Sequence, residues 1–281
     1  MSRTLFTAAG CARCHIARKF MQGKGIAYEE HDISGEGRDL FGRFYRVHRS
    51  AIFRGPEGIE FPVMEDGESV RQGVGAVIGY LHSGTKLDGF ISRSNLSKGW
   101  IDGLRVSGGD PAMADDLAAV LGFMKKSGLK LQLDTNGKNA PLLNYLLERG
   151  LGDRVIMDLK GPQGLYRALL GEEIDPAETA STMKLVMNFP EYRFETTVNP
   201  IQRERGSVGY LTPEEIEETA RWLKEATGIH KQPYLLRLFN PETCVDERFR
   251  SMDRLPPQAL LRYRTAARKH QVLTEIEKAP Q

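Results

Sequence analysis

The chain has 281 residues, of which 40% are hydrophobic. Lysine and arginine together number 39 and aspartate and glutamate 37, so the charge gives no reason to expect nucleic acid or an anionic membrane as a partner. The longest apolar run is too short to cross a bilayer, and the first residues do not resemble a secretory signal. Three cysteines, two of them close together, fit a reducing compartment. We therefore expect a globular cytoplasmic protein.

The first predicted elements are a strand over Arg3 to Thr7 and a helix over Cys11 to Met21. The helix opens with the motif Cys-Ala-Arg-Cys, which contains Cys11 and Cys14. A cysteine at a helix N-terminus lies at the positive end of the helix dipole, which stabilises the thiolate. The charge of Arg13 is expected to act in the same direction. The motif predicts a reactive thiol at Cys11.

The segment from Arg38 to Arg54 interleaves arginine with aromatic residues. The apolar and aromatic side chains between Leu40 and His48 fall at helical spacing on one face. Arg43, Arg46 and Arg49 follow a row on another face. This pattern predicts an amphipathic helix that packs on its neighbour and turns a basic side to solvent. The alternative is that the segment is a docking face for an acidic protein partner or a phosphate group.

The remaining elements of this part are a strand over Ala27 to Asp32, a β-hairpin over Glu60 to Gly73 and a helix over Val74 to Leu81. With the sequences TAAGCARC and FPV, this order resembles the glutaredoxin and thioredoxin family over residues 1–84. The resemblance implies a thioredoxin fold in which Cys11 is the attacking thiol and Cys14 the resolving thiol. It also implies that Pro62 is a cis-proline that faces both cysteines.

Two alternatives for the cysteine motif stay open. Residues Cys11 to His15 match the CxxCH signature of c-type haem attachment. Because the flanking strand, helix and FPV segment favour a thiol site, no haem is expected. The second alternative is a pair of buried structural thiols.

Residues 85–99 are rich in glycine, serine and other polar residues, and they predict a linker. From residue 100 to 281, apolar strands alternate with amphipathic helices. This favours a parallel sheet or barrel, since parallel strands need crossover helices. The predicted strands and the turns that follow them cover Trp100 to Pro111, Leu131 to Gly137, Val155 to Pro162, Phe194 to Pro200 and Tyr234 to Phe239. The predicted helices cover Met113 to Ser127, Asn139 to Arg149, Glu178 to Asn188, Pro213 to Glu225 and Pro257 to His270. We count five strand–helix units.

Polar residues follow these strands, and ligands in such folds bind at the carboxyl ends of the strands. The sequences SGGDP, DTNG and MDLK resemble the radical S-adenosylmethionine (SAM) enzymes, in particular the glycyl-radical activating enzymes, over roughly residues 100–245. The resemblance implies a partial (β/α) barrel, and therefore an α/β protein, whose open end binds SAM. The candidate SAM-binding residues are Ser107, Gly108, Gly109, Asp110, Asp134, Asn136, Lys160 and Asn199.

By position in the family pattern, Gly108, Gly109 and Asp110 would meet the methionine amino group. Asp134 and Lys160 would meet the rest of the nucleotide. The alternative is structural: Asp134 and Asp158 cap the helices that follow them, and Lys160 pairs with one of these carboxylates.

The family's CxxxCxxC loop is absent from residues 85–110. The chain has one further cysteine, Cys244, after the last predicted strand. Three cysteines are the number that holds a [4Fe–4S] cluster with one open iron. Cys11, Cys14 and Cys244 are therefore candidate cluster ligands, and a disulfide relay that hands oxidation to Cys244 is an equal alternative.

Three functions follow from these features. The first is a thiol–disulfide oxidoreductase that acts on a small-molecule or protein thiol, joined to a barrel that binds SAM or another small anion. The second is a radical SAM enzyme or glycyl-radical activase with the three-cysteine cluster. The third is a degenerate barrel that serves as a non-enzymatic binding module.

Overall fold

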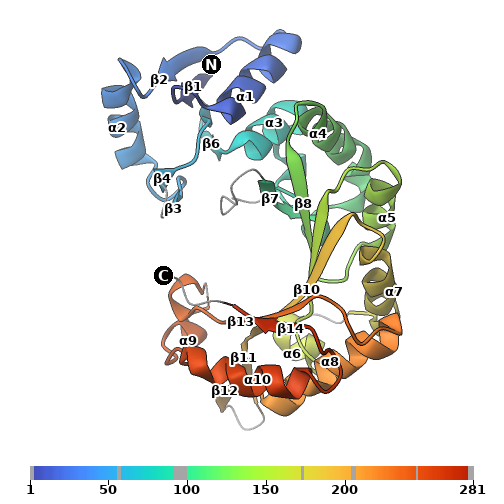
Figure 1. The fold of residues 1–281 in the computed structure, drawn as a ribbon. Coiled ribbons are helices and arrows are strands. Elements are labelled where there is room, and N and C mark those ends of the chain that lie inside the picture. Colours follow the sequence, from blue (N-terminus) through green and yellow to red (C-terminus); the bar gives the residue numbers. More distant parts are fainter. Residues whose placement is uncertain are drawn as a thin grey trace. The chain divides into compact units, whose positions relative to one another are not determined.

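The computed structural model describes residues 3–55, 58–91, 100–171, 174–203, 207–244 and 246–277. The chain forms two compact units, and each is described by itself (Figure 1). The first unit comprises residues 1–133 and 148–153, and the second comprises residues 134–147 and 154–281. Much of the predicted linker, residues 92–99, lies outside the described residues. Within the described residues, no helix combines the length and apolarity needed to span a membrane.

The first unit contains a four-stranded sheet in the order β2-β1-β5-β6. Its strands are β1 (Thr4–Thr7), β2 (Glu29–Asp32), β5 (Val63–Asp66) and β6 (Ser69–Gln72). β1 runs parallel to β2 and antiparallel to β5, and β5 and β6 form an antiparallel hairpin. The first two predicted strands and the predicted hairpin are thereby confirmed. A short antiparallel pair of β3 (Arg54–Gly55) and β4 (Gly58–Ile59) was not predicted.

Side chains alternate between the two faces of this sheet, as the strand geometry requires. On one face, Leu5 and Met64 pack with helices α1 (Ala12–Gly23) and α3 (Val74–Ser83). On the other face, Phe6 and its neighbours on the sheet pack against α2. The helices that follow the strands therefore cover both faces.

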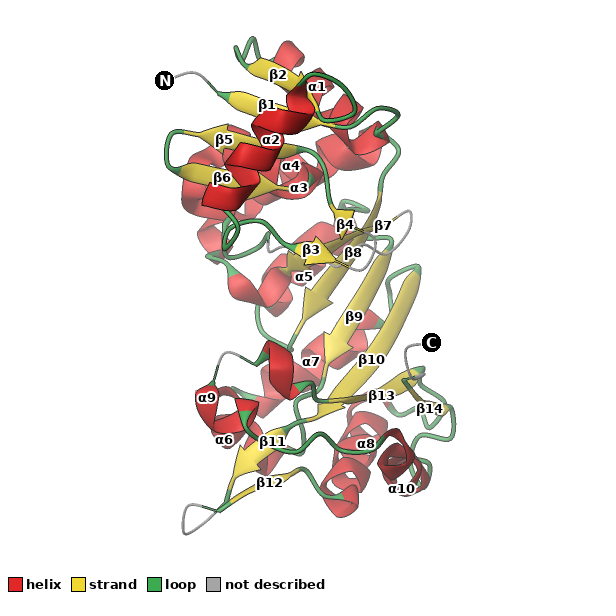
Figure 2. Cartoon of the chain, turned by 90° about the vertical axis from the view of Figure 1, so that its left-hand side faces the viewer, coloured by secondary structure: helices red, strands yellow, loops and turns green. Residues whose placement is uncertain are grey.

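Helix α2 (Gly37–Val47) is the predicted amphipathic helix. Phe41 and Phe44 are buried against the sheet, and the arginines of the opposite face are exposed. Figure 2 shows α2 lying across the sheet. Gly42 lies in the exposed middle of the helix, and a Cβ added there would meet no atom within 4 Å. A glycine at such a position costs about 1 kcal/mol relative to alanine, and packing in the described structure gives no reason for it.

The first unit continues beyond residue 84. It includes 3₁₀ helix η1 (Gly84–Leu87), strand β7 (Trp100–Arg105), 3₁₀ helices η2 (Val106–Gly108) and η3 (Pro111–Met113), and helix α4 (Ala114–Lys126). The ring of Phe20 on α1 lies 5.0 Å from the ring of Phe123 on α4, and α3 packs on α4. The compact first unit thus joins the predicted redox domain to the first strand–helix pair of the predicted barrel. The division into residues 1–84, 85–99 and 100–281 stays a prediction.

The larger sheet has the strand order β14-β13-β10-β9-β8-β7. Its further strands are β8 (Lys130–Thr135), β9 (Arg154–Asp158), β10 (Glu191–Val198), β13 (Tyr234–Leu238) and β14 (Thr274–Ile276). Neighbours among β9, β10, β13 and β14 run parallel, which confirms a parallel sheet. The strand β14 was not predicted. An antiparallel pair of β11 (Pro200–Gln202) and β12 (Val208–Tyr210) follows β10.

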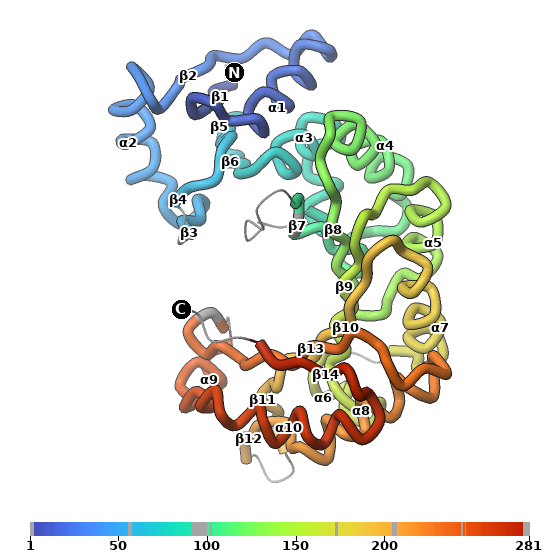
Figure 3. The backbone as a smooth tube through the Cα atoms, viewed as in Figure 1, coloured from blue at the N-terminus to red at the C-terminus, as the bar shows by residue number. Residues whose placement is uncertain are grey.

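The helices of the second unit match the predicted crossovers, apart from two short ones that were not predicted, α6 and α9. They are α5 (Ala140–Glu148, whose last residue belongs to the first unit), α6 (Tyr166–Leu170), α7 (Pro176–Val186), α8 (Pro213–Thr227), α9 (Glu247–Arg250) and α10 (Leu260–Ala267). The described part of this unit also contains the short 3₁₀ helices η4 (Gln163–Leu165), η6 (Pro241–Thr243) and η7 (Pro257–Ala259). α8 and α10 pack side by side (Figure 3).

Helix α8 begins with a capping box that also holds an ion pair. The hydroxyl of Thr212 accepts from the Glu215 N–H, and the Glu215 carboxylate accepts from the Thr212 N–H at 2.7 Å. Arg203 pairs with both oxygens of the same carboxylate. Burial alone would raise the pKa of Glu215, but the hydrogen bonds from Arg203 and Thr212 outweigh it and lower that pKa.

The substitution Glu215→Gln is expected to lower the free energy of unfolding by about 1 kcal/mol at neutral pH. Because the folded-state pKa is depressed, this stabilisation is fully present above the unfolded pKa near 4.5 and is lost as pH falls through the folded value. Urea unfolding of wild type and variant at neutral and acidic pH measures the difference. An equal difference in unfolding free energy at both pH values would contradict a lowered pKa of Glu215 in the folded state.

Candidate functional site

Cys11 and Cys14 form a disulfide at the start of α1. Cys11 is the N-cap residue, and its sulfur accepts from the Cys14 backbone N–H at 3.1 Å. Cys11 is half-buried, whereas Cys14 is fully buried. The two sulfur atoms therefore differ in access, and a bulky reagent reaches Cys11 first.

Pro62 lies beside this disulfide. The Phe61–Pro62 peptide bond is cis, and the Phe61 carbonyl oxygen lies 3.8 Å from the Cys11 sulfur. The Pro62 carbonyl accepts from the Gly73 N–H at 2.8 Å, which ties the segment to the end of β6. The structure thus brings Cys11, Cys14 and Pro62 together.

Arg13 lies between the two cysteines in sequence but forms its bonds elsewhere. Its guanidinium pairs with the Glu60 carboxylate at 2.6 Å, and both side chains are largely buried. It also donates to the Trp100 carbonyl at 2.9 Å. Because Glu60 neutralises this charge, the expected support of the Cys11 thiolate by Arg13 is reduced. Glu60 was missed in the sequence because it is 47 residues from Arg13.

The residues Ser107 to Asp110 belong to the first unit. A Cβ on Gly108 would overlap the carbonyl oxygen of Gly89, and one on Gly109 would lie 2.5 Å from the ring of Phe90. Phe90 is fully buried, and its carbonyl accepts from the Arg105 N–H at 2.6 Å. The two glycines are thus explained by close packing against residues 89–90.

Asp110 follows the glycine pair and lies on the surface. Its carboxylate accepts from the Ala112 N–H at 2.9 Å and caps η3. The carboxylate therefore has a structural role in the described chain, and its remaining lone pairs face solvent.

The other predicted SAM residues belong to the second unit. Asp134 and Asn136 lie at the end of β8, and the Asn136 side chain accepts from the Lys138 N–H at 3.3 Å. Lys160 follows β9, and its ammonium pairs with Asp158, as the structural alternative expected for Lys160. Asn199 follows β10, and its carbonyl accepts from the Leu211 N–H at 2.9 Å. Each of these residues therefore lies where a strand ends.

Asp158 is only half satisfied. One carboxylate oxygen pairs with Lys160, whereas the other is buried without a hydrogen-bond partner among the described residues. Asp158 lies opposite Glu195 on β10 in the parallel register. An unsatisfied buried carboxylate oxygen is costly, so this strand end has capacity to accept a hydrogen bond from a bound donor.

Glu195, at the centre of a charged cluster on β10 and β13, was not predicted as a site residue from the sequence. Glu195 has a side chain only 7% exposed, and Arg193 and Arg237 both pair with its carboxylate. Arg237 also pairs with Glu277 at 3.0 Å. Burial of Arg237 opposes its charge, but Glu195 and Glu277 outweigh this and raise its pKa. The alternation of Arg193 and Glu195 with apolar residues is the signal that could have placed them on one face.

Hydrogen bonds from three neighbouring side chains hold the residues that follow β9 in place. The Tyr234 hydroxyl donates to the Thr196 hydroxyl, which donates to the Leu159 carbonyl, both at 2.7 Å. The Tyr166 hydroxyl accepts from the Lys160 backbone N–H at 3.2 Å. Burial raises the pKa of both tyrosines above the ordinary value, so they stay neutral donors or acceptors. The segment that carries Asp158 and Lys160 is thereby held in place.

Cys244 is a half-buried free thiol in the second unit. Within the described ranges, no three cysteine, histidine or acidic side chains are grouped to hold a metal ion. The sulfur atoms of Cys11 and Cys14 are bonded to each other, whereas a cluster needs them as thiolates. In this oxidised form the residues do not fit a [4Fe–4S] cluster.

These features define an α/β protein that combines a disulfide at a helix N-terminus with a parallel sheet bearing polar strand ends. No family model matches the chain. A protein of Methanocaldococcus jannaschii, named as a candidate glycyl-radical enzyme activating enzyme, is 24% identical over 159 residues. The match covers 54% of this chain and 60% of that protein, so the chain spans about 60% of its curated relative's length. The predicted likeness to glycyl-radical activating enzymes is therefore supported.

Two solved structures are similar to part of the chain. One is a domain of a pyruvate-formate lyase-activating enzyme from Bacteroides vulgatus, with a TM-score of 0.42 and 10% identity, which covers 62% of this chain and 98% of that chain. The other is Streptococcus suis SuiB bound to SAM, with a TM-score of 0.38 and 14% identity, which covers 61% of this chain and 37% of that chain. Both scores are below 0.5, so neither establishes a common fold.

Proposed function

We propose that the chain is a SAM-binding protein of the glycyl-radical activating type. The sequence relationship to the Methanocaldococcus protein carries this proposal. The polar strand ends of the second unit agree with it, because ligands of parallel α/β sheets bind at the carboxyl ends of the strands. The proposed partner is a glycyl-radical enzyme, a protein and not a small thiol.

The residues proposed to hold SAM are those predicted at the strand ends. Asp134 and Lys160 offer a carboxylate and an ammonium for the polar groups of the nucleotide, and Asn136 and Asn199 offer amides. The unpartnered oxygen of Asp158 adds an acceptor for a hydroxyl or ammonium group. SAM, when bound, supplies a sulfonium-activated adenosyl group. The chain's own residues bind and orient the ligand.

The proposed cluster ligands Cys11, Cys14 and Cys244 depend on reduction of the disulfide. In the oxidised form these residues do not fit a cluster. Anaerobic iron and sulfide analysis of the reduced protein tests the ligand set. About four irons per chain, lost in Cys244→Ala, would support it, and iron-free protein would exclude it.

SAM binding is expected for the wild type, and Asp134→Asn is expected to weaken it about tenfold or more, because a hydrogen-bonded carboxylate is lost. Isothermal titration calorimetry of the full chain with SAM measures both affinities. Glu218→Gln is the matched control, since it removes one charge from the exposed face of α8. No binding by the wild type, or equal binding by Asp134→Asn, would count against the site.

A second function is favoured by the disulfide at α1. We propose that the sheet β2-β1-β5-β6 and its helices form a glutaredoxin-like domain, supported by the parallel β1–β2 pair, the motif at the start of α1 and the cis-proline. The Cys11 thiolate attacks a substrate disulfide and releases one thiolate. Cys14 then attacks the Cys11 sulfur and releases the second thiolate. The protein ends as the Cys11–Cys14 disulfide, and an external dithiol must reduce it again.

A further inference from the structure

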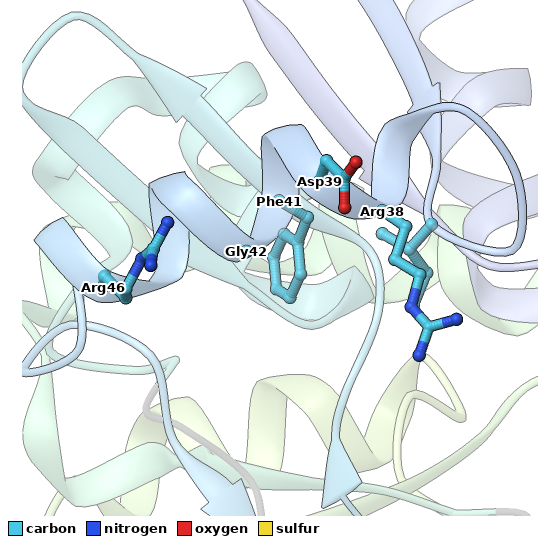
Figure 4. A pocket seen from close by; sticks show the side chains of 6 residues that line it. Arg38, Asp39, Phe41, Gly42 and Arg46 are labelled. Carbon is cyan, nitrogen blue, oxygen red and sulfur yellow. The ribbon is translucent and has the colours of Figure 1, made fainter.

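A hollow of about 520 Å³ lies beside α2 in the first unit. Its lining residues are Ile33, Arg38, Asp39, Phe41, Gly42 and Arg46. Figure 4 shows the Phe41 ring between Arg46 at one end and Arg38 with Asp39 at the other. Two guanidinium groups and one carboxylate therefore border an apolar ring, and the lining carries a net positive charge.

The two arginines lie on one helical stripe with Gly42 between them. Arg38, Gly42 and Arg46 are spaced by four residues, so they follow one another along the same face. All three are exposed. Neither Arg38 nor Arg46 forms an ion pair with any residue that the structure describes. Their charges are available to an incoming anion.

Gly42 keeps the space between the arginines open. A side chain there would meet no described atom within 4 Å, so neither the helix nor the sheet requires glycine at this position. Any larger residue would instead extend into the region between the two guanidinium groups. The glycine is explained if a ligand approaches the helix backbone closely.

The hollow is connected to the disulfide by aromatic contacts. Phe41, in its lining, has its ring 5.1 Å from the ring of Phe61, and the Phe61 carbonyl lies 3.8 Å from the Cys11 sulfur. Ile33, also in the lining, donates its N–H to the Thr7 carbonyl at the end of β1. Two lining residues therefore contact Phe61 and the end of β1, the segments that adjoin Cys11.

The surface beyond the hollow is also basic and apolar. Arg43 and Arg49 are exposed and form no ion pair within the described chain. Val47 is 77% exposed and Phe53 is 42% exposed. Exposed apolar side chains among unpaired arginines form a surface larger than a single small anion needs, and such a surface is typical of a protein contact.

We propose that this hollow binds an extended acidic segment of a protein partner. Arg38 and Arg46 are eight residues apart, which is about 12 Å along a helix. An extended peptide advances about 3.3 Å per residue, so two acidic side chains four residues apart reach both arginines from one face. An apolar side chain between them meets Phe41. A segment with two acidic side chains pairs with both arginines at once and leaves the guanidinium groups apart.

The inference rests on the proposed thiol exchange only for its biological use, since a partner bound in the hollow would be held on the unit that carries Cys11. Binding itself is measured apart from exchange. If Cys11→Ser loses thiol exchange but still binds the acidic peptide, the result bears on the thiol site and leaves the peptide-binding proposal supported.

The test uses the full chain and a fluorescein-labelled peptide with the core Glu-Ser-Leu-Ser-Glu, compared with the same peptide carrying glutamine in place of glutamate. Fluorescence anisotropy is expected to show preferential binding of the glutamate peptide, weakened by added salt. Arg38→Gln with Arg46→Gln is expected to weaken binding about tenfold or more. Lys24→Gln, at the exposed end of α1 and outside this surface, is the matched control and is expected to change binding less than about twofold.

Gly42→Leu gives an independent variant that leaves every charge in place. It is expected to reduce peptide affinity about tenfold by filling the hollow, with a melting temperature equal to or above that of the wild type. Equal binding of the two peptides, or unchanged binding by the double arginine variant, overturns the proposal. Displacement of the peptide by glutathione with the same arginine dependence also overturns it, because the hollow would then be a small-thiol site.

Discussion

Cys11→Ser is expected to abolish disulfide reduction, whereas Cys14→Ser is expected to stop at the mixed disulfide after it releases one thiolate. Cys11 is the half-buried sulfur and Cys14 is fully buried, so only Cys11 can reach a substrate. The Cys14 N–H points at the Cys11 sulfur and stabilises the thiolate there. Without Cys11 no mixed disulfide forms. Without Cys14 the mixed disulfide forms and persists, because no second thiol resolves it.

The measurement follows release of the coloured thiolate from an aromatic disulfide in a Cys244→Ser background, which removes the one other cysteine of the chain. The reduced parent protein should release two thiolates per chain and return to the Cys11–Cys14 disulfide. Cys14→Ser should release one and gain the mass of the bound half. If Cys11→Ser releases thiolate at the rate of the parent protein, Cys11 is not the attacking thiol.

The residues proposed for thiol exchange and those proposed to bind SAM at the strand ends of the second unit are different, so the two proposals can fail separately. Cys11 and Cys14 belong to the first unit, and Asp134 and Lys160 belong to the second. A protein that exchanges thiols but binds no SAM would be a redox protein with a sheet that has another role. A protein that binds SAM with an inert disulfide would leave the activase-type proposal standing.

Local patterns were sufficient to predict the elements that bury a regular face. The helical spacing of Phe41 and Phe44 placed α2, since both side chains enter one core. The strand β14 was missed because it is only three residues long and Thr274 alone is buried within it. Three residues are too few to show the alternation of buried and exposed side chains that marks a strand. The strand ends were predicted from residue type, because polar residues directly after an apolar run mark the edge of a sheet.

Contacts between distant residues could not be predicted in this way. Arg13 seemed suited to support the Cys11 thiolate from its neighbouring position, but the fold brings Glu60 within 2.6 Å of it. Glu195 lies within an otherwise apolar strand, and only the side-by-side arrangement of β10 and β13 supplies Arg237 as its partner. Pairings of this kind depend on tertiary structure that one sequence does not encode in any local period.

Gly108→Ala is expected to lower the free energy of unfolding by roughly 3 kcal/mol, the upper part of the range for overpacking. The added Cβ would overlap the carbonyl oxygen of Gly89, and neither group is a flexible side chain that could turn away. The two backbone segments must therefore separate. Gly122→Ala is the control, because that glycine lies within α4 and its Cβ would have only an ordinary contact at 3.9 Å.

Urea unfolding of these variants without ligand decides what the glycine pair does. Helix propensity predicts that Gly122→Ala is neutral or stabilising by up to about 1 kcal/mol. A large loss in Gly108→Ala in the absence of SAM means that the glycine serves packing, whatever it contributes to a ligand. If Gly108→Ala instead unfolds like the wild type but no longer binds SAM, residues 89–90 move aside at little cost. The glycine is then needed for the ligand and not for packing. The same motif can therefore have a structural cause in the free protein and a functional one in the bound protein, and only the ligand-free measurement separates them.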